Sequence, residues 1–99
     1  LNASRVPLIT ARNCLEVQKL AAELTETGNL NAISDAASAA TLARAALTCA
    51  AYNVRINLNN LSGVEETQTL IAQLTEIESQ SDQIDSSVKQ TLGERGGLK

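Results

Sequence analysis

The residue with the clearest capacity for chemistry in this sequence is Asp35, which follows Asn31 and Ser34 where a helix is predicted to begin. A carboxylate held there can act as a general acid-base or as the partner of a cation. It can equally be an ordinary helix cap, stabilised by the peptide dipoles of the first turn. Since a helix N-terminus favours negative charge, the position suits an ion pair or a hydrogen-bond acceptor better than an acid.

Two asparagines further along form a second candidate. Asn53 and Asn57 are one helical turn apart and share a face, and Cys49 lies one turn before them. Asparagine is unfavourable inside a helix, so either this face is solvated or the amides bind something. Both interpretations remain open, and the three residues form one semi-polar stripe.

Several kinds of chemistry are excluded by composition. The chain has no histidine, which removes Ser-His and Cys-His nucleophile pairs and His-based zinc sites. With 11 acidic against 8 basic residues, the net charge of −3 argues against binding nucleic acid through phosphates. No glycine-rich phosphate loop is present. Cys14 and Cys49 are interpreted as buried free thiols, since two cysteines make no disulfide framework.

Helices must position these residues. Pro7 suits the first turn of a helix over residues 6–27, and Gly28 suits its end. Residues 29–33 form a short connection with turn-favouring asparagines. Ser34 or Asp35 then caps a second helix over residues 35–61.

The second helix is small on nearly every face, because its first half is almost all alanine. We interpret it as the buried central member of a helical cluster. A third helix follows the capping box from Ser62 to Glu65. It carries a heptad seam, with apolar residues spaced by four and three and a serine once among them: Leu70, Leu74, Ile77, Ser81, Ile84 and Val88. The tail over residues 93–99 contains three glycines and is predicted to be loose.

The resulting prediction is an all-α helical bundle, one domain over residues 1–99. The core must be built from Leu, Ile, Val and Ala, since Phe, Trp and Met are absent. A chain this short buries a thin core, and two neighbours cannot cover the alanine helix. We therefore expect a partner chain or a further helical segment to complete the bundle. No apolar run is long enough to cross a bilayer, and we expect a soluble cytoplasmic protein.

Three blocks of sequence carry a resemblance to a known family: RVPL at 5–8, GNLNAISDA at 28–36 and AYNVRINL at 51–58. In these blocks the chain is similar to the cyclodeaminase-like domain of the formiminotransferase-cyclodeaminase family, whose free-standing members are methenyltetrahydrofolate cyclohydrolases. The resemblance covers essentially the whole chain, and the second and third blocks are its most specific parts. Such domains are all-helical homodimers about twice this long. Their N-terminal half, with a GGGS-like segment, has no counterpart here, so the chain resembles the C-terminal half.

The resemblance implies folate one-carbon chemistry, as a hydrolase or ammonia-lyase acting on the cyclic amidine of a tetrahydrofolate derivative. It makes Asp35 the catalytic carboxylate, with Asn31 and Ser34 orienting it and Asn53 and Asn57 lining the pocket. The tetrahydrofolate derivative is the substrate, and no cofactor, metal, nucleic acid or membrane is expected. The expected partner is a second copy, forming a dimer, or a separate N-terminal half. The alternative is a non-catalytic helical assembly or dimerisation module derived from that family.

Overall fold

A computed structural model describes residues 2–59 and 65–99, with side chains from residue 5 onward. The described residues form three long α-helices and no strand, which confirms the all-α prediction. They are α1 (Asn2–Thr27), α2 (Ile33–Leu58) and α3 (Glu65–Gly96), with a short 3-10 helix η1 (Leu30–Ala32) between α1 and α2.

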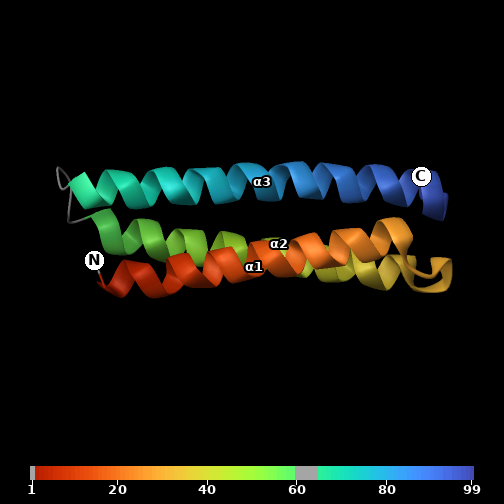
Figure 1. The fold of residues 1–99 in the computed structure, drawn as a ribbon, viewed down its shortest axis with the longest axis horizontal. Helices are drawn as coiled ribbons and strands as arrows, with labels where there is room; N and C mark the ends of the chain where they lie inside the picture. Colours follow the sequence, from red (N-terminus) through yellow and green to blue (C-terminus); the bar gives the residue numbers. More distant parts are fainter. Residues whose placement is uncertain (1, 60–64) are drawn as a thin grey trace.

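The helices lie side by side in an up-down-up bundle. α1 and α2 run antiparallel and share the most extensive interface, and α3 lies along both of them (Figure 1). The molecule is a rod measuring 49 × 17 × 17 Å. The turn between α1 and α2 and the C-terminus lie at the same end of this rod (Figure 1).

The boundaries of the first two helices differ from the predicted ones. α1 begins at Asn2, so Pro7 lies inside the helix and not in its first turn. α2 covers Ile33–Leu58 where residues 35–61 were predicted. Its N-cap is Ala32, which makes no side-chain capping bond, so neither Ser34 nor Asp35 is the cap. The capping serine predicted for α3, Ser62, lies outside the described residues.

The core follows the buried faces of the three helices in two clusters. The larger is built from large aliphatic side chains of all three helices together with alanines, and the smaller lies under the turn between α1 and α2. The predicted seam of α3 is confirmed, with Ile84 half-buried and the other five positions buried. The smaller cluster consists of Ala21, Ala37, Ala40 and Val88.

The serine within the seam of α3 has a buried partner on α1. The Ser81 hydroxyl donates a hydrogen bond to Gln18 Oε1 at 2.7 Å, and Gln18 Nε2 donates to the Ser81 carbonyl oxygen at 3.1 Å. Gln18 is fully buried. Because each polar group satisfies the other, this pair fixes the register of α1 against α3.

The glycine-rich tail is ordered, so the prediction that it is loose was wrong. α3 continues through Gly93 and ends at Gly96. Gly97 adopts a left-handed conformation with φ of 66°, and the Leu98 N–H donates to the Leu92 carbonyl oxygen at 3.1 Å. The left-handed glycine turns the chain back on α3, and the bond gives a partner to one of the last carbonyls of the helix, which have none within it.

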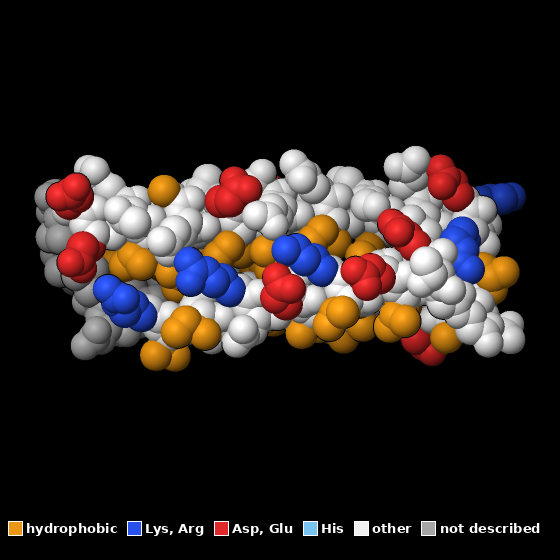
Figure 2. Space-filling view, in the orientation of Figure 1, with side chains coloured by type: hydrophobic (Ala, Val, Ile, Leu, Met, Phe, Trp, Pro, Cys, Tyr) orange, Lys and Arg blue, Asp and Glu red, His pale blue; other side chains and the backbone are white. Residues whose placement is uncertain are grey.

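The faces of α1 and α2 that point away from α3 carry exposed hydrophobic side chains. Figure 2 shows hydrophobic side chains gathered along the edge away from α3, and charged side chains where α1 meets α3. We call the open surface the outer face; its large exposed hydrophobic residues are Val6, Val17, Leu20, Leu24, Leu42 and Ile56.

Candidate functional site

Asp35 lies in the first turn of α2 and is exposed to solvent. The turn before it is built by Asn29, whose side-chain Oδ1 accepts the Asn31 N–H at 2.9 Å and whose carbonyl accepts the Ala32 N–H at 3.0 Å. Such short-range bonds are what asparagine contributes to turns. Since the free N–H groups of a helix N-terminus favour an anion, Asp35 is held where its negative charge is stabilised.

Asn31 and Ser34 lie in the same turn and are also exposed. The structure therefore brings together three of the predicted site residues at one end of the rod. Within residues 5–59 and 65–99, no Lys or Arg side chain forms an ion pair with the Asp35 carboxylate. This arrangement leaves the carboxylate accessible to a ligand.

A residue that sequence reasoning missed supports this turn from α3. Arg95 donates one hydrogen bond to the Thr25 carbonyl oxygen at 2.5 Å and another to the Gly28 carbonyl oxygen at 3.0 Å. These carbonyls lie at the end of α1 and just after it, where the last carbonyls of a helix have no hydrogen-bond donor within the helix. The position of Arg95 in a glycine-rich tail gave no signal for this contact.

Asn53 and Asn57 line a groove between α1 and α2, together with Cys49. The groove has a volume of about 500 Å³. Its wall on α1 is formed by Val6, Pro7 and Thr10, and Ala46 and Ala50 complete its wall on α2. The predicted semi-polar stripe of α2 is thus confirmed as one surface. Cys49 is exposed and Cys14 half-buried, so the prediction of two buried thiols was wrong, although both are free.

The two groups of predicted site residues are far apart. Asp35 and Asn53 are separated by 18 residues of continuous helix, which corresponds to about 27 Å at 1.5 Å per residue. Asn57 is one turn further away. One chain therefore does not bring Asp35 and the asparagine pair to the same reacting atom.

The groove continues along the outer face as a mainly apolar surface. A second hollow of about 500 Å³ shares Thr10 and Ala46 with the first and is lined by Cys14, Val17 and Leu42 among others. Exposed positions of α2 follow a spacing of four and three from Asp35 to Asn53: Ala39, Leu42, Ala46 and Cys49. This is the spacing with which one helix packs against another.

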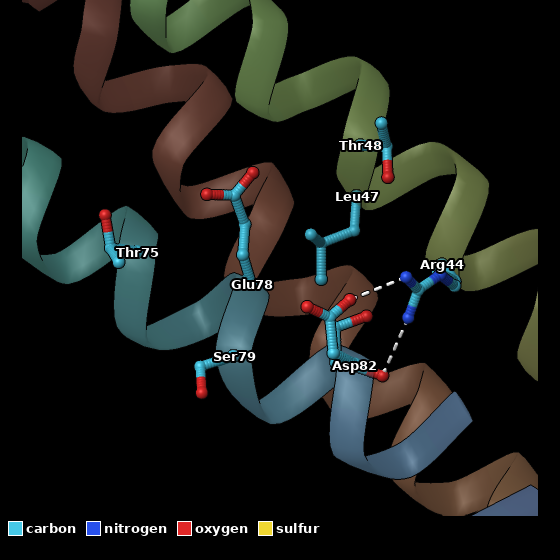
Figure 3. A pocket seen from close by; sticks show the side chains of 8 residues that line it. Arg44, Leu47, Thr48, Thr75, Glu78, Ser79 and Asp82 are labelled. Atoms are coloured by element: carbon cyan, nitrogen blue, oxygen red, sulfur yellow. Dashed lines mark hydrogen bonds and ion pairs between the residues drawn. The ribbon is translucent and has the colours of Figure 1, made fainter. Parts of the chain in front are cut away.

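A more polar cleft of about 470 Å³ lies between α2 and α3, where Arg44 and Asp82 face each other (Figure 3). Arg44 donates to Asp82 Oδ1 at 2.6 Å and to the Ser81 carbonyl oxygen at 3.1 Å. The nearby Glu78 belongs to a second pair, with Arg55 donating two hydrogen bonds to its carboxylate at 2.5 and 2.9 Å. Because these charges neutralise one another, we interpret the side chains of the cleft as ion pairs that join α2 to α3.

Two features are absent from the described part of the chain, a cluster of metal-ligating side chains and a membrane-spanning helix. No group of three or more His, Cys, Asp or Glu residues is placed there to hold a metal ion. None of the helices over residues 2–59 and 65–99 is long and apolar enough to cross a membrane.

Comparison with known proteins shows the family of this chain. The family model described as formiminotransferase-cyclodeaminase matches residues 1–83. The chain belongs to this family. It is 34% identical over 90 residues to a methenyltetrahydrofolate cyclohydrolase of Methylorubrum extorquens. No solved structure matches the chain.

The match to that relative covers 91% of this chain but 43% of the relative, so the chain spans less than half the relative's length. The family match includes α1, α2 and the turn with Asp35, and ends at residue 83 within α3. The last turns of α3, with Arg95, lie beyond it.

Proposed function

We propose that this member of the formiminotransferase-cyclodeaminase family acts in folate one-carbon metabolism, opening the cyclic amidine of a methenyltetrahydrofolate-type substrate. The observation that carries the proposal is Asp35, an accessible carboxylate at a helix N-terminus within the sequence block that resembles the family. The similarity to a methenyltetrahydrofolate cyclohydrolase supports the hydrolytic reaction over ammonia release. The substrate itself carries the one-carbon unit, so no further cofactor is proposed.

In the proposed reaction, water adds to the amidinium carbon between two nitrogens and gives a tetrahedral intermediate. The proton from the water must leave the new hydroxyl, and a proton must reach the nitrogen whose bond to carbon breaks. Asp35 is proposed to accept the hydrogen bond of the attacking water and to stabilise the cationic amidinium. Asn31 and Ser34, in the same turn, are proposed to orient Asp35 and the substrate.

A homodimer is proposed as the active form, with the outer face as its interface. The distance between Asp35 and Asn53 is bridged if α2 packs antiparallel on α2 of a second copy. When such a contact is centred on Ala45 and Ala46, Asp35 lies within about one turn of Asn53 and Asn57 of the second copy. The small exposed alanines at the centre allow the two helices to approach closely.

Charge supports the antiparallel direction. At the Asp35 end of α1 and α2, Glu23 and Asp35 are exposed and acidic. At the other end Arg5 is exposed. An antiparallel pair places the acidic end of one copy beside the basic end of the other, whereas a parallel pair places like charges together. Binding of a separate N-terminal half in place of a second copy is the other outcome that a test must distinguish.

The catalytic proposal is tested with purified protein and methenyltetrahydrofolate, whose characteristic absorbance disappears when the ring opens. Wild-type protein is expected to accelerate this loss over buffer, and Asp35→Asn to abolish the acceleration. Glu26→Gln is the matched control, since it removes an exposed carboxylate at the same end of the rod. Equal rates for wild type and Asp35→Asn would contradict the proposal.

The competing function is a non-catalytic helical module that keeps the packing of the family. It is favoured by one observation, the chain's coverage of only 43% of its relative. A folded protein that self-associates but leaves methenyltetrahydrofolate unchanged would support this function. Cytoplasmic location stays a prediction.

A further inference from the structure

The turn that carries Asp35 has little to hold it in place by itself. Asn29, Leu30, Asn31 and Ala32 are all exposed, as are Ser34 and Asp35. The described internal bonds of this connection are the two accepted by Asn29, the bond from the Ile33 N–H to the Leu30 carbonyl oxygen, and the bond from the Gly28 N–H to the Leu24 carbonyl oxygen at 2.7 Å. α2 also lacks a side-chain cap. A segment with few buried contacts and exposed hydrogen bonds opens easily unless something else ties it down.

The end of α3 supplies that support. The guanidinium of Arg95 spans the carbonyls of Thr25 and Gly28, on either side of the point where α1 ends. A planar fork of donors suits two acceptors at once, and a cation is favoured at a helix C-terminus. The contact therefore fixes the exit of the chain from α1 toward Asn31 and Asp35.

A second contact from the same turn of α3 reaches the start of α2. A Cβ placed on Gly96 would lie 3.5 Å from Ile33 Cγ2, so the α3 backbone approaches the first residue of α2 closely. Leu92 packs on the small core cluster under this end of the rod. The left-handed Gly97 then closes α3. Both sides of the turn are thus held by residues 92–97.

We propose that Arg95 is a positioning residue for the Asp35 site. Its guanidinium holds the turn between α1 and α2 in one conformation. The C-terminal turn of α3 therefore helps to position Asp35. The catalytic consequence rests on the proposed folate function, whereas the effect on the turn does not. Arg95 lies beyond residues 1–83, the part that matches the family model.

The test compares Arg95→Gln with Arg55→Gln. Both remove an arginine that joins two helices, but Arg55 contacts Glu78 near the opposite end of α2. Amide hydrogen exchange is measured by NMR for residues 29–36 and for the middle of α2. In Arg95→Gln the turn amides are expected to exchange at least tenfold faster, while those in the middle of α2 change less than twofold. In Arg55→Gln the turn amides are expected to keep their wild-type rates.

Two further variants separate positioning from general destabilisation. Arg95→Lys retains the charge but not the fork, and is expected to restore only part of the protection. Gly97→Ala strains the left-handed residue that closes α3, and is expected to loosen the same amides with Arg95 still present. Turn exchange that is unchanged in Arg95→Gln, or that rises equally in Arg55→Gln, would overturn the proposal.

The activity measurement then tests the link to the site. At saturating substrate, Arg95→Gln is expected to lose about tenfold in rate, with Arg55→Gln within twofold of wild type. Loosened turn amides with an unchanged rate would overturn the role of Arg95 in the site. Absence of activity in every variant, wild type included, would contradict the proposed function, and the exchange data would still decide whether Arg95 holds the turn.

Discussion

Gln18 and Ser81 form a reciprocal hydrogen-bonded pair in the centre of the bundle, 63 residues apart in sequence. Both side chains are almost fully withdrawn from solvent. Because a polar group buried without a partner is costly, only the native register of α1 against α3 is free of that penalty. The pair therefore favours one register of α1 against α3 in a core whose other buried side chains are mostly aliphatic.

A substitution of this pair gives the first prediction. Ser81→Ala leaves Gln18 Oε1 without its hydroxyl donor and is expected to lower the free energy of unfolding by about 1–3 kcal/mol. The double variant Gln18→Leu/Ser81→Ala removes both polar groups and is expected to recover most of that loss. Urea denaturation followed by circular dichroism measures both. A double variant that is less stable than Ser81→Ala would show that the pair stabilises the fold by more than the hydrogen bonds that each residue gives the other.

The second prediction concerns Arg55 and Glu78, which join α2 to α3. The hydrogen bonds that Arg55 donates to the Glu78 carboxylate raise the pKa of the Arg55 guanidinium above its ordinary value. A raised folded-state pKa adds stability wherever the group is protonated, and the addition is lost only as pH rises through that value. The contribution is therefore expected to be constant from pH 7 to pH 10. Since both side chains are about a third or more exposed, it is expected to be at most about 1 kcal/mol.

A double-mutant cycle checks this value. Arg55→Gln and Glu78→Gln are each compared with the double variant by urea denaturation, at low salt and at 1 M NaCl. The coupling free energy is expected to shrink in high salt, because ions screen partly exposed charges. Coupling that grows between pH 7 and pH 10 would contradict the assignment.

The sequence predicted the parts of this fold that depend on periodicity. The seam of α3 was readable because apolar residues recur with spacings of four and three, and Ser81 was visible as its exception. The partner of Ser81 was not, since an isolated Gln18 on α1 looks the same whether it is buried or solvated. Pairing across 63 residues depends on how the helices align, which composition does not specify.

The same distinction applies to the candidate site. Asn29 and Asn31 marked the turn, because asparagine side chains bond to nearby backbone. Arg95 gave no such signal, because three glycines around it favour a loose tail and the contact that orders them is made to another helix. The separation of Asp35 from Asn53 followed directly from the helix rise once α2 was continuous. What the sequence left open was whether a second chain brings them together.

The third prediction tests the outer face as an interface. Leu42→Glu places a charge in the middle of the apolar surface, where the wild-type leucine is 70% exposed. If this face joins two copies, wild-type protein is expected to elute as a dimer in size-exclusion chromatography with light scattering, and Leu42→Glu as a folded monomer. Leu98→Glu is the control, since Leu98 is similarly exposed at the end of α3. A folded wild-type monomer at all concentrations would contradict self-association.

The fourth prediction tests whether two copies share a site. If Asp35 of one chain works with Asn53 of the other, Asp35→Asn and Asn53→Asp homodimers are each expected to be inactive. Mixing them by unfolding and refolding makes half of the dimers mixed, and each mixed dimer contains one site with both native residues and one with neither. Activity of about a quarter of the wild-type value is therefore expected to return, as follows from two-fold symmetry.

No recovery, with mixed dimers present by native mass spectrometry, would place the site within one chain. Full activity of the Asn53→Asp homodimer would exclude Asn53 from the site, because a carboxylate in place of the amide adds a charge next to the proposed position of Asp35.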